Sequence, residues 1–583
     1  MDLSLEQRLL RFLAREERGE QRAHRELRAQ PVELRVLEGE CIQGARYVRE
    51  DGGAFVFAVP DNGSKFRHGD PLLVGDGVDL DDALPLACGA YDADRGELRL
   101  EPDPYARDAP WELEVGRDYV LDRRPLGLQG RLRDAVRAAF TVPALAEVLL
   151  GRRAVEHDEA RRERARQRLA ASGLNRAQIE AGAAAIGTES LALVQGPPGT
   201  GKTRLLAQVV AALCAAGCRI AVSAFTHRAV DNALLAIRRA APRLPLVKLA
   251  SSSSDGRDEL RAAEVALVDA RRARLPERGV VVAGTCFQLA KLQDRERFHY
   301  TVFDEAGQLP IPHALPGMLR AQRWLFFGDH QQLPPVVTAT HADRGISVSI
   351  FEHLHGHYGA SLLDTTYRMN DGVCGLVSAT FYGGRLQAEP TVGRRRLAFA
   401  PGGRLDEVLD PERPVVWLRL DHRQPGQRSH EEAHAVADLV DDLVRQHGVA
   451  PAEIAVIAPF RAQVRLLRTA IEHKGIGGAE AITVDTVERI QGQEREVVIV
   501  SLTAGDPEEV RGRGAFHLSM HRLNVALSRA RTKAILVASS HAFRALPHDP
   551  DGLRMASRGL ELRDRMHGVD LTRLYVAGGG TSA

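Results

Sequence analysis

The stretch GPPGTGKT at residues 196–203 restricts the fold of this chain more than any other feature. It matches the pattern GxxxxGKT, in which glycines let backbone N–H groups surround phosphate oxygens, the lysine neutralises them and the threonine hydroxyl meets Mg²⁺. A strand-like apolar run, LALVQ, precedes it, and a helical pattern, RLLAQVVAALCAAG, follows it. The loop is therefore expected at the N-terminus of a helix, which favours anions. The predicted phosphate-binding residues are Gly196, Pro197, Pro198, Gly199, Thr200, Gly201, Lys202 and Thr203.

The totals describe an ordinary globular enzyme of several domains. The chain has 583 residues, too many for one hydrophobic core. It has no run of about 18 apolar residues and no secretory signal at its N-terminus, so we expect a cytoplasmic protein with no membrane partner. Lys and Arg number 78 and Asp and Glu 77, so bulk charge does not indicate a nucleic-acid partner. Cys214 and Cys218 form an isolated CxxxC, which favours burial over a metal or redox role.

Strand-like and helical segments alternate twice along the chain. From residue 173 the strand-like runs are LALVQG, IAVSAF, VVVAGT, YTVFDEAG and RWLFFGD. From about residue 360 they are PVVWLRL, IAVIAP, AITVDT, EVVIVSLT and AILVASS, separated by helices over 430–447 and 461–474. Such alternation predicts parallel sheets covered by helices. The chain is therefore expected to form two α/β lobes, of which only the first has a phosphate-binding loop.

The N-terminal region has a different pattern. VELRVLEGE, GAFVFAV, DPLLVGDGV, GELRLEP and WELEVGRDYVL are short strand-like runs between turn residues, which predicts a small β-barrel or sandwich. The arginine-rich segment before residue 172 is expected either to pack beside the first helix as a stalk or to lie in solvent. The predicted units are a helix over 1–30, a barrel over 31–122, a helical stalk over 123–172, lobes over 173–345 and 346–575, and a disordered tail over 576–583. An irregular loop is expected over 388–412.

Two further strand ends carry polar residues that suit nucleotide hydrolysis. YTVF ends in Asp304 and Glu305, at the edge where α/β sheets bind ligands. Asp304 is expected to hold Mg²⁺, and Glu305 to orient the attacking water. RWLFFG ends in Asp329, and Gln332 follows it, within reach of the γ-phosphate. From that stretch alone a polar turn is the better explanation.

The second lobe offers arginines to the same reaction. Arg368 in LDTTYRMN and Arg529 in LNVALSRARTK are candidates to reach the γ-phosphate across a cleft, because guanidinium groups suit phosphate oxygens. From their spacing alone, surface charge remains the more common explanation for both.

The motifs taken together resemble those of superfamily 1 helicases, in the branch that includes the nonsense-mediated-decay helicase. The ordered set is GPPGTGKT, FTHRAVDNA, DEAGQ, GDHQQLPP, TTYRMN, VDTVERIQGQEREVVIVSLT and LNVALSRAR, over roughly residues 174–540. The resemblance implies two tandem RecA-like lobes of the P-loop NTPase fold, and a small β-barrel on helical stalks at the N-terminus. FRHGDPLLV is the best local match for that barrel.

The resemblance also implies roles for individual residues. Gln178 would read adenine, Tyr367 would stack on it, and Glu494 would lie near the ribose. Gln332 would sense the γ-phosphate, and Arg368 and Arg529 would act as arginine fingers. The positions that would line a single-strand channel are Thr226, Asn232, Thr285, Pro459, Arg461 and Thr486.

Several positions depart from the family pattern. Thr366 stands where the family has glutamine, Gln331 where it has a lysine or similar residue, and Glu488 with Arg489 where it has an acidic residue followed by a small one. The second accessory insertion of the family is expected to be reduced to a short segment after residue 250, and no nuclease domain is indicated.

The predicted function is that of an ATP-dependent helicase acting as a monomer. It would move 5′-to-3′ on single-stranded or tailed duplex DNA or RNA without reading the sequence. One alternative is a translocase that strips proteins from strands. Another is a switch whose ATP-dependent closure recruits a protein.

Overall fold

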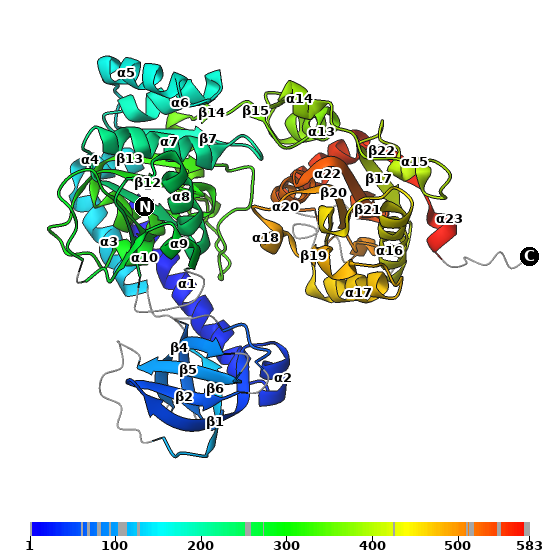
Figure 1. The fold of residues 1–583 in the computed structure, drawn as a ribbon, viewed down its shortest axis with the longest axis horizontal. Helices are drawn as coiled ribbons and strands as arrows, with labels where there is room; N and C mark the ends of the chain where they lie inside the picture. Colours follow the sequence, from blue (N-terminus) through cyan, green and yellow to red (C-terminus); the bar gives the residue numbers. More distant parts are fainter. Residues whose placement is uncertain are drawn as a thin grey trace, which may run out of the picture.

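The computed structural model describes residues 3–59, 62–66, 70–78, 83–92, 95–102, 113–124, 129–250, 258–271, 273–423, 426–508, 511, 518–544 and 550–576. Figure 1 shows a small barrel at the end of a long helix, a first lobe built around one sheet and a second lobe built around another. This confirms the predicted fold class of two parallel-sheet lobes with an N-terminal barrel on helical stalks. The predicted disordered tail falls, after residue 576, outside the described residues.

The barrel is closed, with strand order β1-β2-β5-β4-β3-β6, and every neighbouring pair is antiparallel. One of its predicted strands is wrong, because VELRVL forms the short helix α2 (Val32–Leu37). Within it Arg35 is buried between Asp122 and the carbonyl of Gly77, whereas Leu37 is 81% exposed. The strands are β1 (Cys41–Asp51), β2 (Ala54–Ala58), β3 (Pro71–Gly75), β4 (Leu84–Asp92), β5 (Glu97–Pro102) and β6 (Asp118–Arg123).

Helices α1 (Leu5–Arg28), α3 (Gln129–Thr141) and α4 (Pro143–Leu149) join the barrel to the first lobe. The Glu16 carboxylate of α1 accepts the backbone N–H groups of Thr338 (2.8 Å) and Ala339 (3.0 Å). The stalk is thereby bonded to the loop that follows Gln332. Helix α5 (Glu159–Ala170) was expected beside α1 or in solvent, but it packs on α6 (Arg176–Gly187) instead.

The first lobe has an eight-stranded sheet of order β10-β9-β11-β8-β12-β13-β7-β14, in which every described pair is parallel. The last strand of this sheet is β14, so the boundary between the lobes follows Leu362 rather than residue 345. The strands are β7 (Leu191–Gln195), β8 (Ile220–Ala224), β9 (Leu246–Leu249), β10 (Ala266–Val268), β11 (Val281–Thr285), β12 (Phe298–Phe303), β13 (Ala321–Gly328) and β14 (Ser361–Leu362).

Helices cover this sheet and pack it against the stalk. They are α7 (Lys202–Ala215), α8 (His227–Ala240), α9 (Asp258–Ala262), α10 (Cys286–Leu289), η1 (Ala306–Gln308), α11 (Ile311–Met318), η2 (Arg344–Ile346) and α12 (Ile350–Tyr358). The segment after residue 250, expected as a reduced insertion, supplies α9 and the edge strand β10; residues 251–257 and 272 lie outside the described residues.

The second lobe has a six-stranded sheet of order β19-β18-β20-β21-β17-β22, again parallel throughout. Its strands are β17 (Val415–Arg419), β18 (Ile454–Ile457), β19 (Thr483–Asp485), β20 (Arg495–Ser501), β21 (Ala530–Ala538) and β22 (His567–Asp570). A two-stranded sheet, β15 (Thr365–Thr366) with β16 (Gln387–Ala388), lies where the chain passes between the lobes.

The helices of the second lobe are α13 (Asp371–Phe381), α14 (Pro390–Gly393), α15 (Asp406–Leu409), α16 (His430–Arg445), η3 (Pro451–Glu453), α17 (Arg461–Glu472), η4 (Ala479–Ala481), α18 (Val487–Ile490), α20 (Met520–Leu527), α21 (His541–Arg544), α22 (Pro550–Asp564) and α23 (Thr572–Tyr575). Of the helices in the described ranges, none combines the length and apolarity that crossing a bilayer needs.

Candidate active site between the lobes

The glycine-rich loop connects β7 to α7, as predicted. Gly199 and Gly201 have φ values of 75° and 74°, a conformation that glycine adopts without strain. Helix α7 begins at Lys202, so the free N–H groups of its first turn face the loop. The N–H of Gly196 donates to the carbonyl of Gly328 at 2.9 Å, which ties the loop to the end of β13.

Lys202 lies beside the two carboxylates that end β12. Its Nζ is 2.9 Å from Oε1 of Glu305 and 4.0 Å from Oδ1 of Asp304. Burial lowers the pKa of Lys202, but the two carboxylates outweigh burial and raise it, so the ammonium stays charged. Burial raises the pKa of Asp304 to about 6, against the effect of Lys202. The site therefore concentrates one cation and two carboxylates in a largely buried space.

Glu305 is held in an uncommon backbone conformation. Its φ is 51°, in the left-handed region that non-glycine residues seldom occupy and that clusters at functional sites. The next turn lies against the end of β13, because a Cβ on Gly307 would be 2.5 Å from the carbonyl oxygen of Asp329. The two strand ends therefore approach closely only because position 307 is glycine.

The oxygen donors at this edge fit Mg²⁺. Thr203 offers a hydroxyl and Asp304 a carboxylate, the hard ligands that Mg²⁺ takes when nucleotide phosphates and water complete its shell. Ser223, whose carbonyl accepts the N–H of Asp304, has a buried hydroxyl without a hydrogen-bond partner in the protein. Within the described ranges no group of three or more His, Cys, Asp or Glu could hold a metal without such help.

The chain entering the second lobe lies directly on the phosphate-binding loop. The hydroxyl of Thr366 donates to the carbonyl of Pro198 at 2.9 Å, and the N–H of Tyr367 donates to the carbonyl of Gly199 at 2.9 Å. A Cβ on Gly199 would be 2.6 Å from the Cβ of Arg368. Thr366, which departs from the family pattern, therefore makes a direct bond to the loop.

The predicted base-binding residues already have hydrogen-bond partners within the protein. Tyr367 is 41% exposed, and its hydroxyl accepts a hydrogen bond from Nδ2 of Asn175 at 2.9 Å. The amide of Gln178 is bonded at both ends, to the N–H of Asn175 (3.0 Å) and to the carbonyl of Thr200 (2.8 Å). Reading adenine through Gln178 would require it to exchange these bonds.

Both predicted arginine fingers belong to one cluster on the second lobe. Nε of Arg368 donates to Glu494 at 2.8 Å, so Glu494, predicted near the ribose, pairs with a finger. Arg529 is 3% exposed and donates to backbone carbonyls of Val525 (3.0 Å) and Gln493 (3.4 Å). Burial and the Arg368 guanidinium lower the pKa of Arg529 to about 9, whereas Glu305 across the cleft favours its charged form. Arg529 is thus a buried cation whose bonds go to second-lobe carbonyls, and Arg368 donates to the carbonyl of the preceding residue, Ser528, at 3.1 Å.

Large parts of the chain match known proteins. Residues 173–375 and residues 346–541 each match an AAA domain model. The "DNA replication ATP-dependent helicase/nuclease JHS1" of Arabidopsis thaliana is 30% identical over 400 residues, which cover 64% of this chain and 29% of that protein. The "DNA replication ATP-dependent helicase/nuclease DNA2" of Mus musculus is 29% identical over 409 residues, covering 64% of this chain and 38% of that protein.

The chain therefore contains two regions that match AAA domains, and over 64% of its length it is similar to proteins named ATP-dependent helicases. It spans about a third of the length of the curated relatives it matches. The crystal structure of the arterivirus helicase, nonstructural protein 10, matches with 14% identity and a TM-score of 0.38, covering 88% of this chain and 80% of that one.

The predicted nucleic-acid residues lie at or just after the carboxyl ends of strands, except Asn232, which lies in the helix after β8. Thr226 follows β8 and caps α8, and Asn232 lies exposed on that helix. Thr285 ends β11 and is 5% exposed, so its hydroxyl serves as a helix cap more than as a free surface group. In the second lobe Pro459 and the exposed Arg461 follow β18, and Thr486 follows β19.

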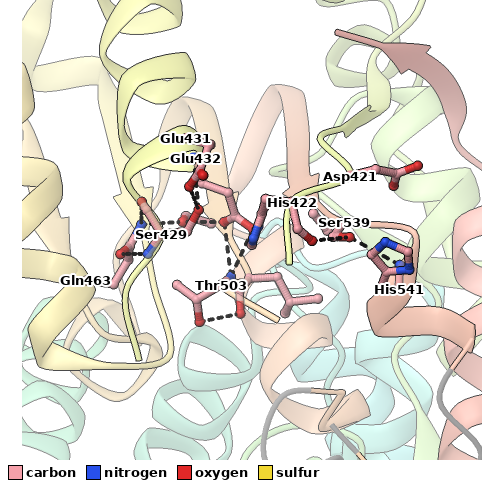
Figure 2. Close-up of polar contacts among 12 residues, drawn as sticks. Asp421, His422, Ser429, Glu431, Glu432, Gln463, Thr503, Ser539 and His541 are labelled. Carbon is pink, nitrogen blue, oxygen red and sulfur yellow. Dashed lines mark hydrogen bonds and ion pairs between the residues drawn. The ribbon is translucent and has the colours of Figure 1, made fainter. Parts of the chain in front are cut away.

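A buried polar network supports this edge of the second lobe (Figure 2). The carboxylate of Glu432, in the first turn of α16, accepts hydrogen bonds from Nε2 of His422 (2.9 Å), the hydroxyl of Ser501 (2.7 Å) and the N–H of Thr503 (3.0 Å). Thr503 has a φ of 61°, so the carboxylate holds a strained residue at the end of β20. Gln463, in the helix that begins at Arg461, donates to Ser501. The network thus connects β17, β20, α16 and α17.

The pair of His422 and Glu432 predicts a pH-dependent stability. Burial lowers the pKa of His422, but the hydrogen bond and charge of Glu432 outweigh burial, so the pKa is raised. Because the pKa of His422 is higher in the folded state, its protonation stabilises the fold. This contribution is complete below the pKa of the unfolded state, about 6.5, and is lost as the pH rises through the pKa of the folded state. We expect His422→Asn to lower the free energy of unfolding by about 3 kcal/mol at pH 6 and by less at pH 9, measured by urea unfolding.

The exposed His434, on the same helix, gives the control for this prediction. His434→Asn should leave both unfolding curves unchanged. An equal loss for His422→Asn at the two pH values would show that the charge of His422 contributes nothing.

Sequence reasoning missed several residues of this candidate site. Asn175, Gln195, Tyr382 and Asn524 make bonds within or across it, and none of them was assigned a role from the sequence. Two of them had a usable signal: Gln195 is a polar residue at the end of the apolar strand that precedes the loop, and Asn524 lies in the motif LNVALSRAR. The isolated cysteines are free thiols, and burial raises the pKa of Cys214 to about 12.

Proposed function

We propose that this chain is an ATP-driven helicase that moves 5′-to-3′ along a nucleic-acid strand and opens duplexes ahead of it. The names of its relatives concern DNA replication, which favours DNA over RNA. The observation that carries the proposal is the placement of Arg368 against Gly199 of the loop, with its guanidinium bonded to the carbonyl of Ser528, the residue before Arg529. One reaction centre then requires both lobes, so each hydrolysis cycle can move one lobe relative to the other.

The residues of the site divide the work of ATP hydrolysis. Lys202 binds the β- and γ-phosphates, and a γ-phosphate competes with Glu305 for its ammonium. Glu305 then orients the attacking water and takes its proton. Arg368 and Arg529 stabilise the negative charge that develops on the γ-phosphate, and Gln332 donates to it. Mg²⁺, held by Thr203 and Asp304, would neutralise phosphate charge.

The strand is bound by groups that do not read bases. Threonine hydroxyls, Asn232 and Arg461 suit phosphate and sugar oxygens, which are the same for every sequence. These groups lie on both sheets, so closure of the lobes moves one set of contacts relative to the other. We propose that a monomer is sufficient, because both halves of the reaction centre belong to one chain.

The test is strand displacement with duplexes that carry either a 5′ or a 3′ single-stranded tail. We expect ATP-dependent opening of the 5′-tailed duplex only, and a higher ATPase rate with single-stranded DNA than with a matched RNA. Opening from 3′ tails alone would reverse the polarity. Displacement of a bound protein without duplex opening would favour a translocase, and an ATPase rate unaffected by either strand would favour a protein-recruiting switch.

A further inference from the structure

Asp329, at the end of β13, is the centre of a buried hydrogen-bond network that spans the two lobes. Its Oδ1 accepts from Nε2 of Gln195 (3.1 Å) and the N–H of Gln331 (3.2 Å). Its Oδ2 accepts from Nε2 of Gln332 (2.8 Å) and the hydroxyl of Tyr382 (2.6 Å). Four bonds satisfy a carboxylate, and Asp329 is 3% exposed. The strand before the phosphate-binding loop and the proposed γ-phosphate sensor therefore share one acceptor.

The second lobe enters this network through two side chains. Tyr382 follows α13, and Asn524 lies in α20; they are 2% and 0% exposed. Nδ2 of Asn524 donates to the Tyr382 hydroxyl (3.0 Å) and to the carbonyl of Gln331 in the first lobe (2.8 Å). A carbonyl can only accept, which fixes the orientation of this amide. Burial and Asp329 raise the pKa of Tyr382 well above its ordinary value, so its hydroxyl keeps the proton it donates.

Helix α20 leads directly to the second arginine finger. It ends at Leu527, and Nε of Arg529 donates back to the carbonyl of Val525, the neighbour of Asn524. The other bond of Arg529 goes to the carbonyl of Gln493. Arg529 is therefore held by backbone of the second lobe, and that backbone is bonded to the first lobe through Asn524.

We infer that Tyr382 and Asn524 are positioning residues that align Arg529 with the γ-phosphate by bonding α20 to the Asp329 network. When Gln332 turns to the γ-phosphate, it weakens its hydrogen bond to Oδ2 of Asp329, the oxygen that also accepts from Tyr382. Tyr382 and Asn524 transmit that change to α20. The inference rests on the proposed function only in requiring Arg529 to act on ATP. It does not require nucleic acid.

The experiment compares Tyr382→Phe, Asn524→Ala and the double variant with the unaltered chain. The readouts are kcat and KM for ATP without nucleic acid, the affinity for a fluorescent ATP analogue and the thermal midpoint. Tyr382→Phe keeps the ring and removes only the hydroxyl. We expect kcat to fall about tenfold in each variant, with KM and analogue affinity within about twofold. The fall in kcat of the double variant should be no greater than that of the more impaired single variant, because both side chains act through one network.

Tyr358→Phe provides the matched control, since the Tyr358 hydroxyl also donates to a backbone carbonyl, that of Val148 in the stalk, at 3.1 Å. It should keep the kcat of the unaltered chain. Unchanged kcat in Tyr382→Phe and Asn524→Ala would overturn the inference, as would losses in thermal midpoint and analogue affinity that account for the whole fall. Failure of strands to stimulate the unaltered ATPase would contradict the helicase proposal alone, because the positioning effect is read without nucleic acid.

Discussion

Replacing Arg529 with alanine is expected to lower kcat for ATP hydrolysis by about 10²-fold or more while nucleotide affinity stays close to that of the unaltered chain. The guanidinium is buried and is bonded to two backbone carbonyls, and the charge of Glu305 favours its protonated form. Its charge therefore matters most when negative charge develops on the γ-phosphate. Single-turnover hydrolysis and binding of a fluorescent ATP analogue measure the two effects separately.

Arg445 of the same lobe is the control. It is partly exposed on α16 and donates to the carbonyls of Lys474 and Gly475, so Arg445→Ala should hydrolyse ATP normally. Normal turnover in Arg529→Ala would remove this arginine from the reaction and, with it, the main reason for a two-lobed motor.

Glu305→Gln should also lose about 10²-fold or more in kcat, because an amide cannot take the proton of the attacking water. Binding of ATP should persist or strengthen, since the substitution removes the carboxylate that competes with phosphate for Lys202 at 2.9 Å. Single-turnover hydrolysis and binding of the fluorescent ATP analogue again measure the two effects. We expect the variant to bind ATP without hydrolysing it.

Glu264 provides a matched control for the backbone. It too has a left-handed conformation, with a φ of 53°, but it lies exposed after α9. Glu264→Gln should therefore be neutral. If Glu305→Gln retained full turnover, the water would have to be activated by another group, of which Asp304 is the nearest candidate.

Much of the fold could be predicted because the long buried strands carry their own signal. LALVQ, IAVSA and VVAGT are apolar runs flanked by helical patterns, and each became a parallel strand. Short edge strands such as β10 and β14 gave no such signal, because their sequences contain too few residues to show a period. VELRVL has the alternation of a strand, but burial of Arg35 against Asp122 stabilises a helix there and leaves Leu37 exposed.

The candidate site also contains residues that the sequence could predict and residues that it could not. Gly196, Asp304 and Asp329, at the proposed phosphate-binding edge, each follow a strand directly, so their positions could be predicted from chain order. Tyr382 follows a helix without any local mark, and Asn524, although it lies in the motif LNVALSRAR, shows no polar partner in its own stretch of sequence. Their importance comes from partners that are 53 and 193 residues away in the chain.

The sequence by itself determined that a phosphate-binding loop joins β7 to α7 and that acidic residues end β12, because loop geometry and strand ends are set by neighbouring residues. Only the tertiary structure decided which lobe contains α12 and β14, how Thr366 lies on the loop, and that Asp329 is bonded to the second lobe. Those contacts join residues far apart in the chain. Their free energy depends on burial and partner geometry, which exist only after both lobes have folded and packed against each other.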